Sequence, residues 1–293
     1  MIKAIIMDMD GTLLDPQNKI CSETKEALQT LEKQGVSLIL ASGRSYTRLL
    51  PYAKELQMDQ YHGYLIEVDG IAIYDMETNK RNVLRRMKPE EIREVYTYLM
   101  TLNCEAHACF DDGLFDYFSD ELYERKKALR RERNLSEDYP WTSGPWDLLA
   151  DLRDGYPKVT YIHSFDEIDR DINKIQLMQD EEIIETIYED LMEKFEDTFE
   201  IFRTCPRQLE ILPKGYSKGK TLKRLMEANA WQADEVLAFG DGENDVSLFE
   251  AVKDSYAMGQ AKDFVKAKAS HVTGSNVEQG ILMALKDLGL VLK

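Results

Sequence analysis

The chain has 293 residues, of which 54 are acidic and 37 are basic, so its formal net charge at pH 7 is −17. A nucleic-acid-binding protein needs a basic face to neutralise phosphates, and this composition excludes nucleic acid as a main partner. No apolar run approaches the roughly 20 residues that a helix needs to cross a bilayer, and the N-terminal sequence turns acidic too early for a signal peptide. Four cysteines in this length indicate reduced thiols, so we expect a cytoplasmic protein without a membrane partner.

The length predicts about two domains of roughly 150 residues, and the distribution of charge indicates where they divide. Residues 84–204 hold 30 acidic and 16 basic side chains, whereas the rest of the chain holds 24 and 21. We therefore predict a core domain made of residues 1–83 and 205–293, interrupted by a separate domain over residues 84–204. No feature of the sequence indicates an oligomeric state.

The first segment alternates short apolar runs with helical patterns. In chain order we predict a strand over 2–7, a helix over 22–34, a strand over 36–41, a helix over 46–56 and a strand from 63. Buried strands separated by helices indicate a parallel sheet with crossover helices, which is an α/β fold.

The middle segment has a different pattern. In chain order we predict a helix over 89–102, strands over 104–110 and 114–118, a charged helix over 120–134, a loop-rich stretch over 139–157, a strand over 172–178, a helix over 180–195 and a strand over 198–203. The two adjacent strands meet at Asp112-Gly113, which is a hairpin signal. Hairpins accompanied by helices indicate an α+β insert in an α/β host.

The last segment resumes the first pattern. We predict a helix over 217–230, a strand over 235–239, a helix over 244–252, a strand over 255–258, a short helix near Asp263, a strand over 271–273 and a helix over 277–288. The sheet of the first segment therefore continues after the insert.

Carboxylates gather where two of the predicted strands end. Asp8 and Asp10 follow the first strand, and Asp241 and Asp245 follow the strand over 235–239. Because ligands bind beyond the carboxyl ends of parallel strands, we expect all four carboxylates to converge at one edge of the sheet. Such carboxylates repel one another unless a cation lies between them, and oxygen ligands favour Mg²⁺. Taken singly, each motif is also compatible with a solvated turn.

Two further motifs suit an anion. Ser42, Gly43 and Arg44 end the second strand and begin a helix, where a hydroxyl and free backbone amides can bind phosphate. The stretch 213–220 opens the helix over 217–230 and contains Lys214, Lys218 and Lys220, and a lysine there can neutralise a phosphoryl oxygen. A P-loop is excluded because Lys214 stands where its first glycine is needed. The spacing of Cys104, His107 and Cys109 matches no common zinc motif.

With these motifs the sequence resembles the haloacid-dehalogenase-like superfamily of phosphohydrolases, and most of all its Cof-type subfamily with a class IIB cap. The motifs that carry the resemblance are D-x-D-G-T-L-L at 8–14, A-S-G-R at 41–44, E-I-L-P-K-G-Y-S-K-G at 210–219 and G-D-G-E-N-D at 240–245. The resemblance spans both outer segments and implies a Rossmann-like core, with the middle segment as the cap.

The resemblance also implies roles for individual residues. Asp8 would be the nucleophile and Asp10 the general acid/base, while Asp8, Asp10 and Asp241 would surround Mg²⁺. The remaining implied roles are phosphate binding by Met9 (through its backbone), Ser42, Gly43, Lys218 and Asn244, and support of the site by Asp245 and Arg44. This chain departs from the family pattern at Asp69, where asparagine is common before glycine, and at Gln260, where asparagine is also common.

The activity implied is a Mg²⁺-dependent phosphatase that acts on small phosphorylated metabolites, with sugar phosphates as the expected class. Two alternatives stay open, namely a sugar phosphomutase and a non-catalytic regulator that binds a phosphometabolite. Intact Asp8 and Asp10 argue against the regulator. The substrate itself cannot be read from the sequence, and residues 139–157 are candidates for specificity.

Overall fold

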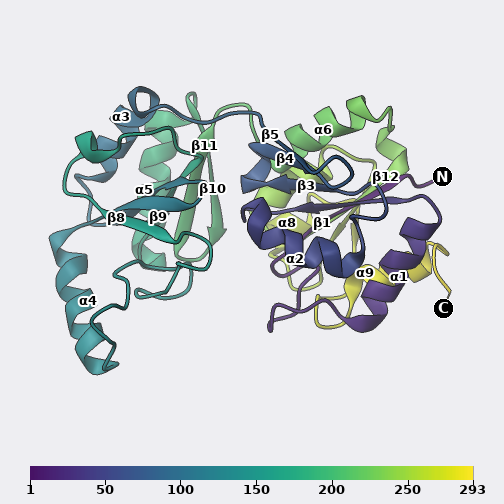
Figure 1. The fold of residues 1–293 in the computed structure, drawn as a ribbon, viewed down its shortest axis with the longest axis horizontal. Helices are drawn as coiled ribbons and strands as arrows, with labels where there is room; N and C mark the ends of the chain where they lie inside the picture. Colours follow the sequence, from purple (N-terminus) through teal and green to yellow (C-terminus); the bar gives the residue numbers. More distant parts are fainter. Residues whose placement is uncertain (293) are drawn as a thin grey trace. The chain divides into compact units, whose positions relative to one another are not determined.

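The structure is a computed structural model that describes residues 1–292, and the chain divides into two compact units. The core unit combines the two ends of the chain, Met1–Leu84 and the residues from Tyr216 onward, and the inserted unit is Arg85–Gly215. Figure 1 shows this division by colour, because purple and blue elements lie among green and yellow ones in the core unit.

The core unit is built on one sheet with the strand order β14-β13-β12-β1-β2-β3-β4-β5 (Figure 1). Its strands are β1 (Ala4–Asp8), β2 (Ser37–Ala41), β3 (Tyr64–Glu67), β4 (Ala72–Asp75), β5 (Lys80–Val83), β12 (Val236–Gly240), β13 (Asp254–Ala257) and β14 (His271–Val272). The strands from β14 to β3 pair in parallel, and β4 and β5 add an antiparallel hairpin at one edge.

Helices cover both faces of the core sheet. They are α1 (Ser22–Lys33), α2 (Tyr46–Leu56), α6 (Lys218–Ala228), α7 (Val246–Phe249), α8 (Asp263–Lys266) and α9 (Gly280–Asp287), with the short 3-10 helices η1 (Val68–Gly70), η3 (Ala233–Glu235) and η4 (Glu243–Asp245). Ile5 and Met7 of β1 pack in a hydrophobic cluster with α1, α2 and α9, whereas Ala4 and Ile6 pack with α6, α7 and α8. Successive side chains of a strand point to opposite faces, so these apolar strands are buried on both sides. The predicted α/β fold class is confirmed.

The inserted unit has its own sheet, with the strand order β10-β11-β9-β6-β7-β8. Its elements are α3 (Pro89–Leu99), β6 (Glu105–Phe110), β7 (Gly113–Phe118), α4 (Asp120–Glu132), β8 (Lys158–Tyr161), η2 (Phe165–Glu167), β9 (Lys174–Met178), α5 (Glu181–Phe195), β10 (Phe199–Cys205) and β11 (Gln208–Pro213). Ala106 and Ala108 of β6 join the hydrophobic cluster of α3 and α5. Glu105 and His107 alternate with them and therefore face the other side.

The structure differs from the sequence-based expectations in several places. The predicted boundary after residue 204 would separate β10 from β11, yet these strands pair with each other and β11 also pairs with β9. The helix expected over 277–288 begins only at Gly280, because Gln279 has a left-handed backbone with φ of 60°. The strands β4, β5, β8 and β11 were not expected. Within residues 1–292, no helix is long and apolar enough to cross a membrane.

Candidate active site

The predicted site residues all lie in the core unit, at one edge of its sheet. Asp8 is the last residue of β1, Ser42 follows β2, and Asp241 follows β12. These three strands are adjacent and parallel, so their carboxyl ends meet at the same edge. The sheet topology therefore brings together motifs that are far apart in the sequence.

A buried lysine lies between two of the aspartates. The Lys218 ammonium group donates hydrogen bonds to Asp8 Oδ1 at 2.6 Å and to Asp245 Oδ1 at 2.7 Å, and its side chain is fully buried. Lys218 is the first residue of α6, and the Ser217 hydroxyl caps this helix by accepting from the Lys220 amide. The lysine is thus fixed both by its helix and by its two carboxylate partners.

Asp241 completes a group of three carboxylates. One oxygen each from Asp8, Asp241 and Asp245 lie within 4.8 Å of one another. The Thr12 hydroxyl donates to Asp241 Oδ1 at 2.8 Å, and Asp245 Oδ2 accepts from the amides of Asp241 and Gly242, each at 3.0 Å. A Cβ at Gly11, whose φ is +85°, would overlap the Asp241 carboxylate, so this turn needs glycine.

One ammonium group does not balance these three carboxylates. Burial, reinforced by Asp245, raises the pKa of Asp8 well above its usual value although Lys218 opposes the shift. Burial and Asp245 likewise raise the pKa of Asp241 to about 7. A raised carboxyl pKa means that the ionised form is disfavoured, and a bound cation would relieve this. The three oxygens therefore form a donor set that suits a hard divalent cation.

Asp10 lies apart from this group, contrary to the expectation that four carboxylates converge. The Asp10 side chain is 56% exposed, and Arg44 clamps it through two hydrogen bonds, with Nε donating to Oδ2 at 2.8 Å. The Arg44 guanidinium also lies over the Tyr52 ring, 5.8 Å from its centroid. The arginine of the A-S-G-R motif thus orients the second aspartate of the D-x-D motif.

The residues predicted to bind phosphate surround the same edge. Met9 and Ser42 are buried, and Ser42 Oγ accepts from the Arg44 amide at 3.1 Å. Asn244 lies in η4, and its side-chain amide donates to Asp69 Oδ1 at 2.9 Å. Met9 lies between Asp8 and Asp10 in the loop that follows β1, and Gly43 lies between Ser42 and Arg44 in the loop that follows β2.

Several contacts could not be expected from the sequence. Thr12 holds Asp241, and Asp69 holds Asn244 across the site. Gln260 donates to the carbonyl oxygen of Gly11, and its own carbonyl accepts from the Asn276 amide at 3.3 Å. Gln260, which departs from the family pattern, therefore contacts the D-x-D loop. Thr12 follows the D-x-D-G pattern directly, which was the only signal for its role.

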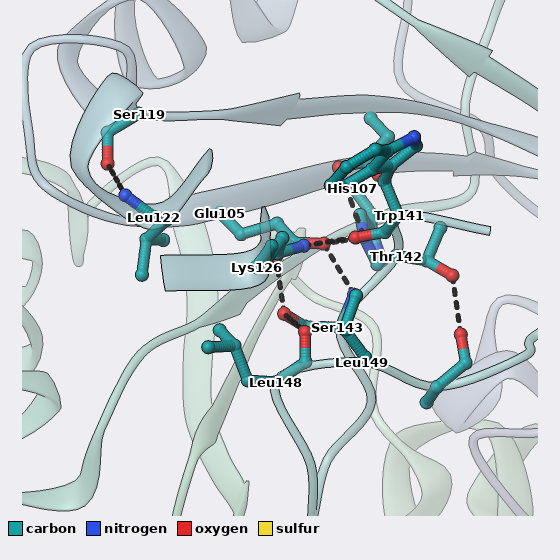
Figure 2. A network of polar contacts seen from close by, with 12 residues as sticks. Glu105, His107, Ser119, Leu122, Lys126, Trp141, Thr142, Ser143, Leu148 and Leu149 are labelled. Atoms are coloured by element: carbon teal, nitrogen blue, oxygen red, sulfur yellow. Dashed lines mark hydrogen bonds and ion pairs between the residues drawn. The ribbon is translucent and has the colours of Figure 1, made fainter. Parts of the chain in front are cut away.

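A second buried polar cluster lies within the inserted unit. Figure 2 shows Lys126 and Ser143 converging on Glu105, with His107 beside them. The Ser143 amide donates to Glu105 Oε1 at 2.6 Å, and His107 Nε2 lies 3.0 Å from the same oxygen and 3.3 Å from Asp116 Oδ1. These oxygen and nitrogen atoms are also close enough to hold a metal ion.

The charges of this second cluster are already matched. Lys126 and His107 counter the effect of burial and lower the pKa of Glu105 to about 2. Burial alone would lower the pKa of His107, but Asp116 and Glu105 raise it to about 9, so the imidazole is protonated at neutral pH. Burial and Glu105 raise the pKa of Asp116 against the opposing effect of His107. Two cations thus face two carboxylates, so the formal charges of this cluster cancel.

The paired cluster anchors a loop. Lys126 also donates to the carbonyl oxygen of Trp141, and Ser143 Oγ donates to that of Leu148 at 2.9 Å (Figure 2). The Thr142 hydroxyl donates to the carbonyl oxygen of Ala150 at 2.7 Å. The contacts fix the part of the 139–157 stretch nearest Glu105, which gives the cluster a structural role.

Comparison with known proteins identifies the family and the fold of this chain. A model of the haloacid dehalogenase-like hydrolases matches residues 5–285. The pyridoxal phosphate phosphatase YbhA of Escherichia coli is 28% identical over 95% of this chain and 96% of its own length. A haloacid dehalogenase-like hydrolase from Bacteroides thetaiotaomicron superposes with a TM-score of 0.74 at 25% identity, covering 98% of this chain and all of its own. A sugar phosphatase of subclass IIB has the same TM-score at 23% identity, covers 99% and 100%, and shows the shared fold.

Proposed function

Because this chain belongs to the family of haloacid dehalogenase-like hydrolases and is a phosphoric monoester hydrolase, we propose that it releases phosphate from small phosphorylated metabolites by using Mg²⁺ and Asp8 as the nucleophile. The observation that carries the proposal is the buried group of Asp8, Asp241 and Asp245 around Lys218 at the carboxyl ends of parallel strands. The proposed nucleophile, Asp8, lies there beside two further carboxylates and the ammonium group of Lys218, and this one positive charge is fewer than the three carboxylates.

Residues of the core unit fit a Mg²⁺ ion. Asp8 and Asp241 offer carboxylate oxygens. The family resemblance adds Asp10 as a third ligand. Mg²⁺, when bound, supplies positive charge that offsets both the carboxylates and the phosphoryl oxygens. Asp245 already binds Lys218 and two backbone amides, so we assign it to support of the lysine and of the loop.

The proposed reaction has two steps. A carboxylate oxygen of Asp8 attacks phosphorus, the ester P–O bond breaks, and Asp10 gives a proton to the departing alkoxide. Asp10 then takes a proton from water as the water oxygen attacks phosphorus, and the bond between phosphorus and Asp8 breaks. The first step leaves Asp10 deprotonated, so that it can act as the base in the second. After the second step Asp10 is protonated again and Asp8 is a free carboxylate, so both residues return to their starting states.

Other residues stabilise the charge of the phosphoryl group. Lys218 lies against the Asp8 carboxylate, where its ammonium group can neutralise a phosphoryl oxygen. The Ser42 hydroxyl, the Asn244 amide and the backbone of Met9 and Gly43 provide donors at the same sheet edge. Arg44 keeps the Asp10 carboxylate in one orientation through its paired hydrogen bonds.

The proposed substrates are small phosphorylated metabolites, with sugar phosphates first. One relative is named for pyridoxal phosphate and one structural neighbour is a sugar phosphatase, so both kinds belong in a screen. We propose the cytoplasm as the location, in keeping with four free cysteines and an acidic composition.

The test is release of inorganic phosphate from p-nitrophenyl phosphate and from a panel of phosphorylated metabolites, each with Mg²⁺ and after exhaustive chelation. We expect release with Mg²⁺ only. Full activity after chelation would contradict the metal assignment, and isomerised product without free phosphate would indicate a phosphomutase. Binding of phosphometabolites without turnover would instead support a regulator.

A further inference from the structure

The turn that follows β3 has an unusual backbone. Val68, Asp69 and Gly70 have φ angles of 48°, 54° and 105°, so three consecutive residues are left-handed. Valine is β-branched and avoids this region, and an aspartate tolerates it better. Asp69 is also only 1% exposed. Strained backbone of this kind is kept only where surrounding contacts enforce it, and it concentrates at functional sites.

This turn contacts the loop after β2 and the start of α6, two parts of the proposed phosphate site. The amides of Val68 and Asp69 donate to the carbonyl oxygens of Arg44 and Ser42, at 3.1 and 3.0 Å. A Cβ at Gly70 would overlap the carbonyl group of Ser217, so the turn packs directly against the start of α6. The turn therefore lies between the loop after β2 and the helix that carries Lys218.

The Asp69 side chain extends the turn to the third loop. Its Oδ1 accepts from Asn244 Nδ2 at 2.9 Å. Asn244 presents its NH₂ group to Asp69, whose carboxyl oxygen accepts the hydrogen bond. An asparagine at position 69 would allow either orientation of the Asn244 amide. The family pattern often has asparagine there, and this chain differs.

We propose that Asp69 is a positioning residue that fixes the Asn244 side-chain amide, so that one N–H bond points to Asp69 and the other is available to a phosphate oxygen. The inference rests on the proposed function, since it assigns a role within the same phosphate site. Asp69 does not itself contact phosphate, because a carboxylate would repel it, and it acts through Asn244.

The experiment measures binding of inorganic phosphate by calorimetry in the presence of Mg²⁺, for the full chain and its variants. Asp69→Gly removes the carboxylate while tolerating the left-handed backbone, and we expect phosphate to bind about tenfold more weakly. Asp69→Asn keeps a side-chain oxygen that can accept from Asn244, so its phosphate affinity should be close to that of the wild type. Asn79→Gly is the matched control, since Asn79 is exposed and also left-handed with φ of 54°.

A double-mutant cycle with Asn244→Ala separates positioning from general damage to the fold. In the Asn244→Ala background, Asp69→Gly should change phosphate affinity by less than about twofold. An equal loss in both backgrounds would overturn the inference, as would tighter phosphate binding by Asp69→Asn. If Asp69→Gly does not fold, the same cycle is run with Asp69→Asn, whose smaller loss should also vanish without the Asn244 amide.

The two proposals fail in different ways. A wild-type protein that binds phosphate but hydrolyses no ester contradicts the proposed function, and the cycle still decides the role of Asp69. A wild-type protein that releases phosphate from esters but binds no inorganic phosphate with Mg²⁺ overturns the role of Asp69 and leaves the proposed function standing.

Discussion

The two units each bury a cluster of carboxylates, and the clusters differ in how their charge is balanced. In the core unit, the ammonium group of Lys218 pairs with Asp8 and Asp245, and the Asp241 carboxylate lies beside these two. In the inserted unit, Glu105 and Asp116 face two cations, Lys126 and His107. Both clusters have the atoms to hold a metal ion, so geometry alone does not separate them.

The difference in charge decides what each cluster does. Burial and the neighbouring Asp245 raise the pKa of Asp8 and Asp241, and a bound cation would relieve this. In the inserted unit two cations face two carboxylates, and this buried polar network holds a loop. A buried carboxylate cluster therefore indicates a metal site only after its own cations have been counted.

The largest expected effect concerns the nucleophile. Asp8→Asn should lower the rate of phosphate release by at least about 10³-fold, because it removes the attacking oxygen anion. The same change removes one charge from a crowded cluster, so the fold should keep its thermal stability in metal-free buffer. Phosphate release and thermal unfolding check the two parts, and wild-type-like turnover would contradict the mechanism.

The second prediction breaks the balance in the inserted unit. Lys126→Met should lower the free energy of unfolding by about 3–5 kcal/mol, since it leaves Glu105 buried without its ammonium partner. Lys127→Met is the control, because Lys127 pairs with Glu124 near the surface and should cost less than about 1 kcal/mol. Urea unfolding measures both. Equal stabilities of the two variants would show that the Lys126 pair is not needed.

The third prediction uses the cation itself. Mg²⁺ at 100 times its dissociation constant should stabilise the wild-type fold by about 2.7 kcal/mol. Asp241→Asn should lose most of this gain, whereas Asp116→Asn should keep it. Thermal unfolding with Mg²⁺ and with chelator measures the shift. A Mg²⁺ effect that depends on Asp116 would reverse the assignment of the two clusters.

The smallest predicted effect is a dependence of stability on pH. The pKa of His107 is about 9 in the fold against 6.5 ordinarily, so its stabilising contribution is full below pH 6.5 and is lost as the pH rises through 9. His107→Gln should therefore be less stable than the wild type by about 2 kcal/mol at pH 6, and the difference should shrink by pH 10. Urea unfolding at several pH values tests this, and a constant difference would contradict it.

The sequence predicted that these motifs meet at one edge of the sheet, because most of them directly follow an apolar strand. Asp8 and Asp241 could be placed at one sheet edge from strand order alone. The partners of Asp10 and Asn244 could not, since they depend on side chains from other loops, Arg44 and Asp69. The left-handed backbone at Val68 has no sequence signal, because valine disfavours it. The strand β11 escaped prediction since only Leu209 and Ile211 alternate within it.

The most direct test compares the two clusters in one assay, by measuring Mg²⁺-dependent release of phosphate from p-nitrophenyl phosphate by Asp241→Asn and Asp116→Asn. We predict that Asp241→Asn loses at least about 100-fold in kcat/KM, which is about 2.7 kcal/mol of transition-state stabilisation, and that Asp116→Asn stays within about threefold of the wild type. Loss of activity in Asp116→Asn with retention in Asp241→Asn would contradict the account.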